Sequence, residues 1–182
     1  MKRLILVAAC AALPAAAPPL AAQRPLSVGL GGGASLPSGS LGEGTSAGWH
    51  ALGTIALGAP MQPLGLRLDL AYNRFGFDDR GRVALGADGH ETVSSATLNA
   101  TYRLPMTDSP LSPYLISGLG AYRTACSLDA GCGGSTRYGW NVGLGTRLFA
   151  LGLRSFVEAR YHRTTRGGSG VHYFPLTLGL TF

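Results

Sequence analysis

Apolar residues recur at every second position through most of the chain beyond residue 25. The clearest internal run carries on one side Leu64, Leu66, Leu68, Leu70 and Tyr72. The positions between them hold Gly65, Arg67, Asp69 and Ala71. Successive side chains of a β-strand point to opposite faces, whereas an amphipathic helix repeats its apolar side chains every three or four residues. The spacing therefore predicts a strand with one apolar face and one polar face.

The same alternation, diluted in places by Gly and Ala, predicts eight strands. They cover about 26–36, 47–58, 64–75, 92–104, 113–124, 136–149, 153–164 and 172–182. The connections between them alternate between short turns and longer segments rich in Gly and charge, which is typical of outer-membrane barrels with short periplasmic turns and long external loops. In a narrow barrel, inward glycines would make room for large neighbours. The predicted fold class is all-β, an eight-stranded antiparallel up-and-down transmembrane β-barrel.

Composition supports a membrane barrel over the other folds that alternate. Charged residues make up 13% of the 182 residues, against about 25% in soluble domains. No apolar stretch beyond the N-terminus is long enough for a membrane helix, and a closed barrel is the other structure that pairs every backbone group in lipid. A soluble β-sandwich would expose Lys and Glu on its outer face, yet the single Lys of the chain is Lys2.

Residues 1–22 are typical of a cleaved secretory signal, with a positive start, an apolar core and small residues before the expected cleavage site at Gln23. An alternative is a lipoprotein signal ending at Cys10, although the apolar run before it is very short. The expected domains are a signal peptide over 1–22 and a barrel over 23–182, exported to the outer membrane of a Gram-negative cell. The mature chain would carry a net charge of about +4, too small and too dispersed to indicate nucleic acid as a partner.

The last strand alternates up to the end of the sequence, with apolar residues at Phe174, Leu176, Leu178, Leu180 and Phe182. This pattern resembles the signal that the barrel-assembly machinery reads in bacterial outer-membrane proteins. The segment 175–182 and the segments PYLISGLG (113–120) and GWNVGLG (139–145) resemble the OmpA/OmpX-like outer membrane protein β-barrel domain family. The resemblance covers about residues 26–182. It implies a closed, monomeric, eight-stranded barrel, and it implies no single shared activity. The partners expected of a barrel at this location are outer-membrane lipid and lipopolysaccharide.

Several charged side chains fall on the inward positions of the predicted strands. They are Arg67, Asp69, Arg103, Arg147, Arg154, Glu158 and Arg160. Eight strands enclose an interior just wide enough for side chains to fill, and an unpaired buried charge is very costly. These residues are therefore predicted to form a charge network that plugs the lumen. The alternative is a polar path or gate for ions.

Other candidate groups lie near the predicted external end. Arg123, Arg137 and Arg163 are expected at the outer rim, where they would bind lipopolysaccharide phosphates or remain solvated. Cys126 and Cys132 are expected to form a disulfide in an oxidising compartment. A metal site would need further nitrogen or sulfur ligands nearby, and none are there.

Aromatic residues near the strand ends predict belts at the two membrane interfaces. The expected external members are Trp49, Tyr72, Phe75, Tyr122, Tyr138, Trp140, Tyr161 and Phe174, and the expected periplasmic members are Tyr102, Tyr114 and Phe182.

The sequence predicts no catalytic, cofactor-binding or metal-binding residues. Lipid A deacylase barrels use a His, a Ser two residues later and an acid. Here the residue two positions after His162 is Thr164 instead of Ser, and the acid Glu158 precedes His162. His162 is also expected to face inward, away from lipid. The acidic loop 76–91 matches no calcium-binding motif. The predicted function is a structural or surface-interaction role, the alternative a narrow pore, and the weaker alternative a lipid A-modifying enzyme.

Overall fold

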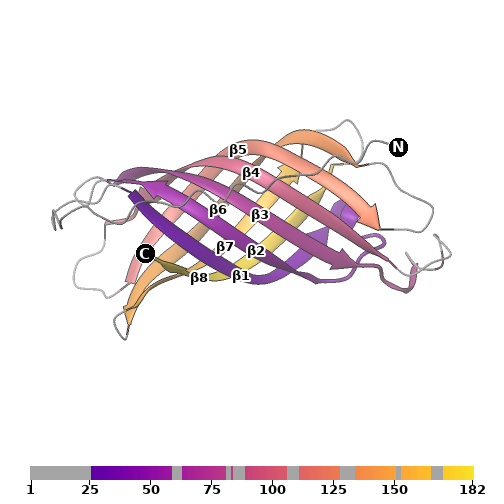
Figure 1. Ribbon diagram of the computed structural model, residues 1–182, viewed down its shortest axis with the longest axis horizontal. Coiled ribbons are helices and arrows are strands. Elements are labelled where there is room, and N and C mark those ends of the chain that lie inside the picture. Colours follow the sequence, from indigo (N-terminus) through magenta and orange to yellow (C-terminus); the bar gives the residue numbers. More distant parts are fainter. Residues whose placement is uncertain are drawn as a thin grey trace, which may run out of the picture.

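A computed structural model describes residues 26–58, 63–80, 83, 89–105, 111–127, 134–150, 153–164 and 170–182. Eight strands, each hydrogen-bonded to the next, form a closed antiparallel barrel (Figure 1), which confirms the predicted fold. They are β1 (Leu26–Ser38), β2 (Gly48–Leu57), β3 (Leu64–Gly76), β4 (His90–Arg103), β5 (Leu111–Ser127), β6 (Ser135–Ala150), β7 (Leu153–Thr164) and β8 (His172–Thr181). A 3-10 turn, η1 (Gly39–Leu41), follows β1. No helix in these ranges is long and apolar enough to cross a membrane.

The barrel closes where β1 pairs with β8, with Leu30 opposite Leu180. At the end of this seam the Phe182 amide donates to the Val28 carbonyl at 2.7 Å, and the Val28 amide donates to the Phe182 carbonyl at 3.2 Å. Closure leaves no strand edge unpaired, as an apolar surrounding requires.

The two ends of the barrel differ in their connections. At one end, here the turn end, β2, β4 and β6 join the following strands through residues 58–63, 104–110 and 151–152. At the other, here the loop end, the connections are 39–47, 77–89, 128–134 and 165–171. In transmembrane barrels of the outer membrane, short turns face the periplasm and longer loops the outside, so the orientation with the turn end towards the periplasm stays a prediction.

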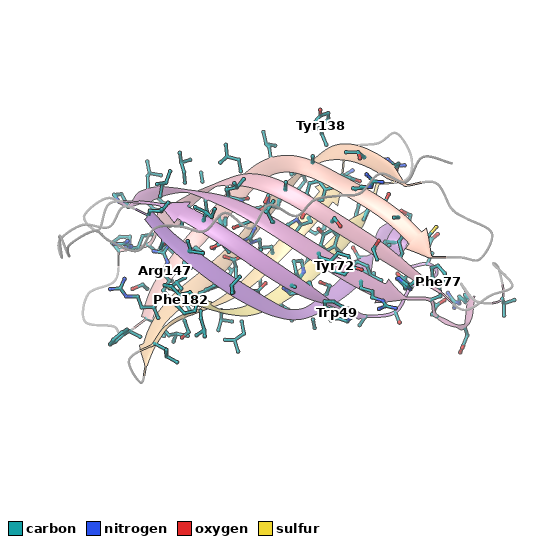
Figure 2. All side chains as sticks on the ribbon, in the orientation of Figure 1. Trp49, Tyr72, Phe77, Tyr138, Arg147 and Phe182 are labelled. Atoms are coloured by element: carbon teal, nitrogen blue, oxygen red, sulfur yellow. The ribbon has the colours of Figure 1, made fainter. Side chains whose placement is uncertain are left out.

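Alternation along each strand places apolar side chains outside and polar ones inside. On β3, Leu64 is 62% exposed, whereas Arg67 and Asp69 are 5% and 2% exposed. This is the reverse of a soluble protein, because the surrounding medium of the barrel is lipid and its interior is polar. Figure 2 shows apolar side chains along the outer surface of the strands.

Outward aromatic rings form pairs close to the loop end. Trp49 and Tyr72 lie with ring centroids 5.7 Å apart (Figure 2). The Tyr161 ring lies near two others, with its centroid 5.6 Å from that of Trp140 and 4.8 Å from that of Phe174. These are the side chains expected of an interfacial belt.

Three of the aromatic residues expected in the belts lie elsewhere. Phe75, Tyr114 and Tyr122 are buried inside the barrel. They occupy strand positions that point inward, so their closeness to a strand end does not bring them to the lipid interface. The prediction for these three residues was wrong.

Inward glycines leave space for large side chains on neighbouring strands. Gly143 pairs with Arg160, and a Cβ at Gly143 would lie 2.7 Å from the Arg160 Cγ. A Cβ at Gly145 would lie 2.6 Å from the Tyr114 hydroxyl. The interior is therefore crowded at the level where the charged residues meet.

Candidate functional site: the barrel lumen

Four charged side chains meet in the middle of the lumen and form what we call the ion-pair layer: Arg67, Asp69, Glu158 and Arg160. The Arg67 Nε lies 2.9 Å from the Asp69 Oδ1, and the Arg67 Nη2 lies 2.8 Å from the Glu158 Oε2. The Arg160 Nη2 lies 2.7 Å from the Asp69 Oδ2, and the Arg160 Nε contacts the Glu158 Oε1. Because β3 and β7 are on opposite sides of the eight-stranded barrel, the Arg67–Glu158 and Arg160–Asp69 pairs cross the lumen, whereas the other two pairs each lie within one strand. Two positive and two negative charges balance within the layer.

Neutral polar side chains from three further strands complete the ion-pair layer. The Tyr114 hydroxyl donates to the Glu158 Oε2 at 2.6 Å. The Asn99 Nδ2 donates to the Asp69 Oδ2 at 2.9 Å, and the Asn141 Nδ2 donates to the Asn99 Oδ1 at 2.8 Å. Buried ion pairs are tolerated when additional hydrogen bonds satisfy the remaining lone pairs. Here β3, β4, β5, β6 and β7 all contribute.

A second group of side chains fills the lumen nearer the loop end, and we call it the aromatic plug. It consists of Leu41, Phe75, Val93, Tyr122, Val171 and Tyr173, all buried. The Tyr173 ring stacks on His162 with centroids 4.8 Å apart and meets Phe75 edge-on at 5.8 Å. The Tyr122 hydroxyl and the His162 Nδ1 are 3.0 Å apart.

Sequence reasoning missed the aromatic plug. Its signal is present, since Phe75, Val93 and Tyr122 are large apolar residues on the inward positions of their strands. They depart from the rule that the interior is polar, and all three lie close to the loop end.

Little space separates the ion-pair layer from the aromatic plug. A buried polar chain lies beside them, in which Ser35 donates to the Asn73 Oδ1 at 2.8 Å and the His50 Nε2 is 2.9 Å from the Thr177 hydroxyl. The cavity between the layers measures about 20 Å³ and is bordered by residues of both, including Asp69 and Tyr173. Such a volume holds about one water molecule.

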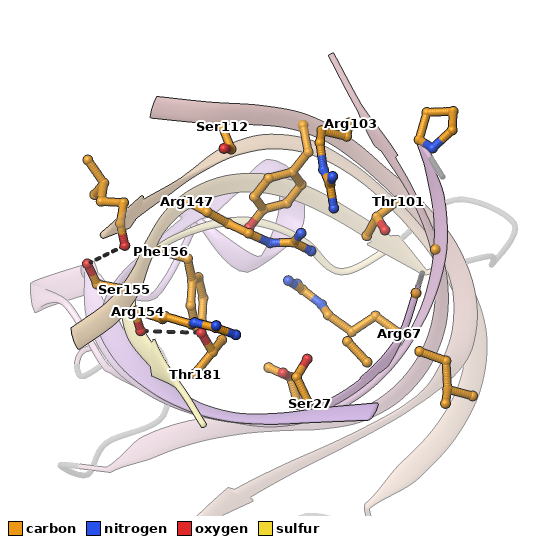
Figure 3. Close-up of a pocket in the computed structure, with 18 of the residues that line it drawn as sticks. Ser27, Arg67, Thr101, Arg103, Ser112, Arg147, Arg154, Ser155, Phe156 and Thr181 are labelled. Carbon is orange, nitrogen blue, oxygen red and sulfur yellow. Dashed lines mark hydrogen bonds between the residues drawn. The ribbon is translucent and has the colours of Figure 1, made fainter. Parts of the chain in front are cut away.

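A much larger cavity opens below the ion-pair layer at the turn end. We call it the turn-end cavity; it measures about 610 Å³. Arg103, Arg147 and Arg154 line it together with Arg67 (Figure 3). Of the seven residues predicted for one network, four form the ion-pair layer and the other three lie in this cavity. The Arg147 guanidinium lies 5.2 Å from the centre of the Tyr114 ring.

The arginines expected at the outer rim differ in orientation. Arg123 on β5 and Arg163 on β7 are exposed and share their strand faces with the outward apolar residues. Arg137 is half-buried and pairs across the sheet with the buried Tyr122, so it points inward, within electrostatic reach of Glu91.

Several predictions concern residues outside the described ranges. Cys126 is disulfide-bonded, but Cys132 lies outside the described residues, so the pairing of the two stays a prediction. The expected signal peptide, 1–22, also lies outside, as does part of the acidic loop 76–91. Among the residues that are described, no three His, Cys, Asp or Glu side chains gather to hold a metal ion.

His162 and Glu158, the two residues compared with the lipid A deacylase motif, make separate contacts inside the barrel. His162 is buried against the aromatic plug, stacked on Tyr173. Glu158 binds Arg67 and Arg160 in the ion-pair layer. Neither group faces the lipid where such a substrate would lie.

The chain matches the family model of the outer membrane protein β-barrel domain over residues 5–182, and it belongs to that family. Among solved structures it is similar to the Neisserial surface protein A (NspA), with TM-score 0.62, 19% identity, and coverage of 87% of this chain and 96% of that chain. It is also similar to a major outer membrane protein from Thermus thermophilus, with TM-score 0.52, 14% identity, and coverage of 86% and 98%. These likenesses show a shared fold. A comparison with curated proteins found no match.

Proposed function

We propose that this protein is a monomeric, non-conducting barrel of the outer membrane that contributes to envelope integrity and presents its loop end to surface partners. Its lumen carries two successive layers of side chains, and this is the observation that supports the proposal. The ion-pair layer spans the interior between β3 and β7. The side chains of the aromatic plug pack against one another nearer the loop end.

The second layer argues against the narrow-pore alternative. Moving the charged side chains apart would expose unpaired buried charges, at a cost of several kcal/mol each. Even then, a path from the turn-end cavity would reach the buried and uncharged side chains of Phe75 and Tyr173. A pore would require both layers to rearrange together.

Solute uptake by proteoliposomes tests the proposal. Vesicles that contain the purified protein are expected to swell in isosmotic arabinose no faster than protein-free vesicles, because the lumen offers no continuous aqueous path. Vesicles with a general porin serve as the positive control. Swelling that rises with the amount of this protein would support the pore instead.

Exposed arginines beyond the outward aromatic rings support a role in binding lipopolysaccharide. Arg163 follows Tyr161 by two positions towards the loop end, on the same strand face, and Arg123 is exposed on β5. Aromatic belts mark the membrane interface, so these guanidinium groups would lie at the level of the lipid A phosphates. Guanidinium binds phosphate through two parallel hydrogen bonds.

Neutralising Arg123 and Arg163 together, as Arg123→Gln/Arg163→Gln, is expected to weaken binding of lipopolysaccharide by at least about tenfold, since each charge-assisted hydrogen bond that is lost contributes about 1.5–3 kcal/mol. The measurement is a titration of the purified barrel with lipopolysaccharide. The double variant Arg147→Gln/Arg154→Gln removes the same charge at the turn end and should bind as the parent protein does. Equal losses in both variants would point to net charge alone and contradict the specific contact.

The last strand supports a role in assembly. Its outward residues Phe174, Leu176, Leu178 and Leu180 are exposed, and the backbone of Phe182 completes the seam with Val28. We propose that the barrel-assembly machinery reads this face before the seam closes. For the mature protein we propose no enzymatic activity.

A further inference from the structure

The turn-end cavity has the size of a ligand pocket. Its volume of about 610 Å³ falls within the range of about 300–1,000 Å³ that is usual for small-molecule sites. Its inner limit is the ion-pair layer, since Arg67 belongs to both. Figure 3 shows the side chains of Arg67, Arg103, Arg147 and Arg154 converging on the same space.

The charges of Arg147 and Arg154 are not balanced by carboxylates among the described residues around them. Arg67 is compensated by Asp69 and Glu158 in the ion-pair layer. Arg147 and Arg154 make no ion pair with a carboxylate within the described ranges, and neither Asp nor Glu occurs among the described residues that line the cavity. Two guanidinium groups therefore share a concave space in which a bound anion would offset their charge.

The cavity also holds its donors in place. The Arg147 guanidinium lies over the Tyr114 ring at 5.2 Å, and the Tyr114 hydroxyl is itself bonded to Glu158 at 2.6 Å. A cation held against an aromatic face loses less freedom on binding a ligand. The hydroxyl groups of Thr101 and Ser112 line the same cavity and can donate to further anion oxygens.

We propose that the turn-end cavity is a binding site for a phosphate-bearing anion that enters from the periplasmic side, with Arg147 and Arg154 as its principal ligands. Phosphate fits because its oxygens accept the paired hydrogen bonds that guanidinium donates. The phosphate group can come from a soluble phosphate ester or from the headgroup of a phospholipid in the inner leaflet. Leu64 and Phe149, which line the cavity and are 62% and 68% exposed, would contact the acyl chains in the second case.

Calorimetric titration of the purified protein in a neutral detergent tests the proposal, with glycerol 3-phosphate as the soluble probe. In a second arm, the protein is extracted from nanodiscs made of phosphatidylcholine and phosphatidylglycerol. Native mass spectrometry then counts the phosphatidylglycerol molecules that remain bound to the protein. Both arms compare the parent protein with Arg147→Gln/Arg154→Gln. Arg74→Gln/Arg80→Gln, which replaces two exposed arginines near the loop end, provides the control with the same net charge. Arg147→Lys/Arg154→Lys keeps the charge and removes the paired donors.

Binding of glycerol 3-phosphate that weakens about tenfold in the Arg147→Gln/Arg154→Gln variant, and is unchanged in the control, supports a site for a soluble ester. Retention of phosphatidylglycerol that is lost in the same variant, without binding of the soluble probe, supports the lipid headgroup. The Lys variant should fall between the parent and the Gln variant in either arm. The proposal is overturned if neither probe binds the parent, or if both Gln variants lose binding equally.

Discussion

Replacing Glu158 by Gln is expected to lower the free energy of unfolding by about 3–5 kcal/mol, the usual cost of breaking a buried ion pair on one side. Glu158 contacts both Arg67 and Arg160 and accepts a hydrogen bond from the Tyr114 hydroxyl. The variant leaves two buried guanidinium groups with Asp69 as their single charged partner in the ion-pair layer. Urea unfolding of the detergent-solubilised barrel, followed by tryptophan fluorescence, measures the change.

The double variant Glu158→Gln/Arg160→Gln is the matched control, because it removes one charge of each sign and leaves the Arg67–Asp69 pair. It is expected to be more stable than the sum of the two single variants predicts, which is the sign of direct coupling. A decrease in the free energy of unfolding below about 1 kcal/mol for Glu158→Gln is the size expected of a solvated surface ion pair. That result would contradict a buried ion-pair layer.

Replacing Tyr173 by Ala is expected to cost about 3–5 kcal/mol, the range for removing a large buried aromatic side chain. Tyr173 is fully buried, stacks on His162 and meets Phe75 edge-on. Its loss would open a void in the centre of the aromatic plug that the backbone of a closed barrel cannot collapse to fill. The same unfolding assay reports the effect.

Tyr173→Phe retains the ring and removes a buried hydroxyl that has no hydrogen-bond partner among the described residues, so it is expected to remain within about 1.5 kcal/mol of the parent or to be slightly more stable. If Tyr173→Ala were as stable as Tyr173→Phe, the ring would not be packed as described. Tyr173→Ala should also remain non-conducting, because the ion-pair layer still spans the lumen.

The fold could be predicted from the sequence because a barrel strand repeats every two residues and lipid selects strongly for that repeat. Each observed strand lies within three residues of its predicted limits. The largest difference is at the loop end of β5, which extends to Ser127 because it stays paired with His90 of β4. Polar loop residues outside the lipid carry no apolar alternation, so the pattern gave no signal there.

Depth along the barrel axis could not be predicted in the same way. Alternation tells which face a side chain occupies, but its level depends on strand tilt and on the register between neighbours. Arg147 and Asn141 share one face of β6, yet Asn141 reaches the ion-pair layer while Arg147 lies in the turn-end cavity. The level of each β6 residue relative to the ion-pair layer is set by the register between β6 and β7, in which Gly145 pairs with Glu158. Sequence alone does not provide this register.

For the aromatic residues the level along the barrel was predicted but the face was not. Position near a strand end was given more weight than the face of the strand on which the residue lies. Tyr72 and Phe75 are three positions apart on β3, and they point to opposite sides. Tyr72 contacts Trp49 on the outer surface, whereas Phe75 joins the aromatic plug.

Conductance of the purified protein in a planar lipid bilayer tests the central claim, that two layers of side chains close the lumen. With the ion-pair layer and the aromatic plug both intact, we expect no steady conductance above that of the bare bilayer at any moderate voltage. A large and steady conductance that follows insertion of the protein would contradict the account, since it would require a continuous aqueous path past both Glu158 and Tyr173.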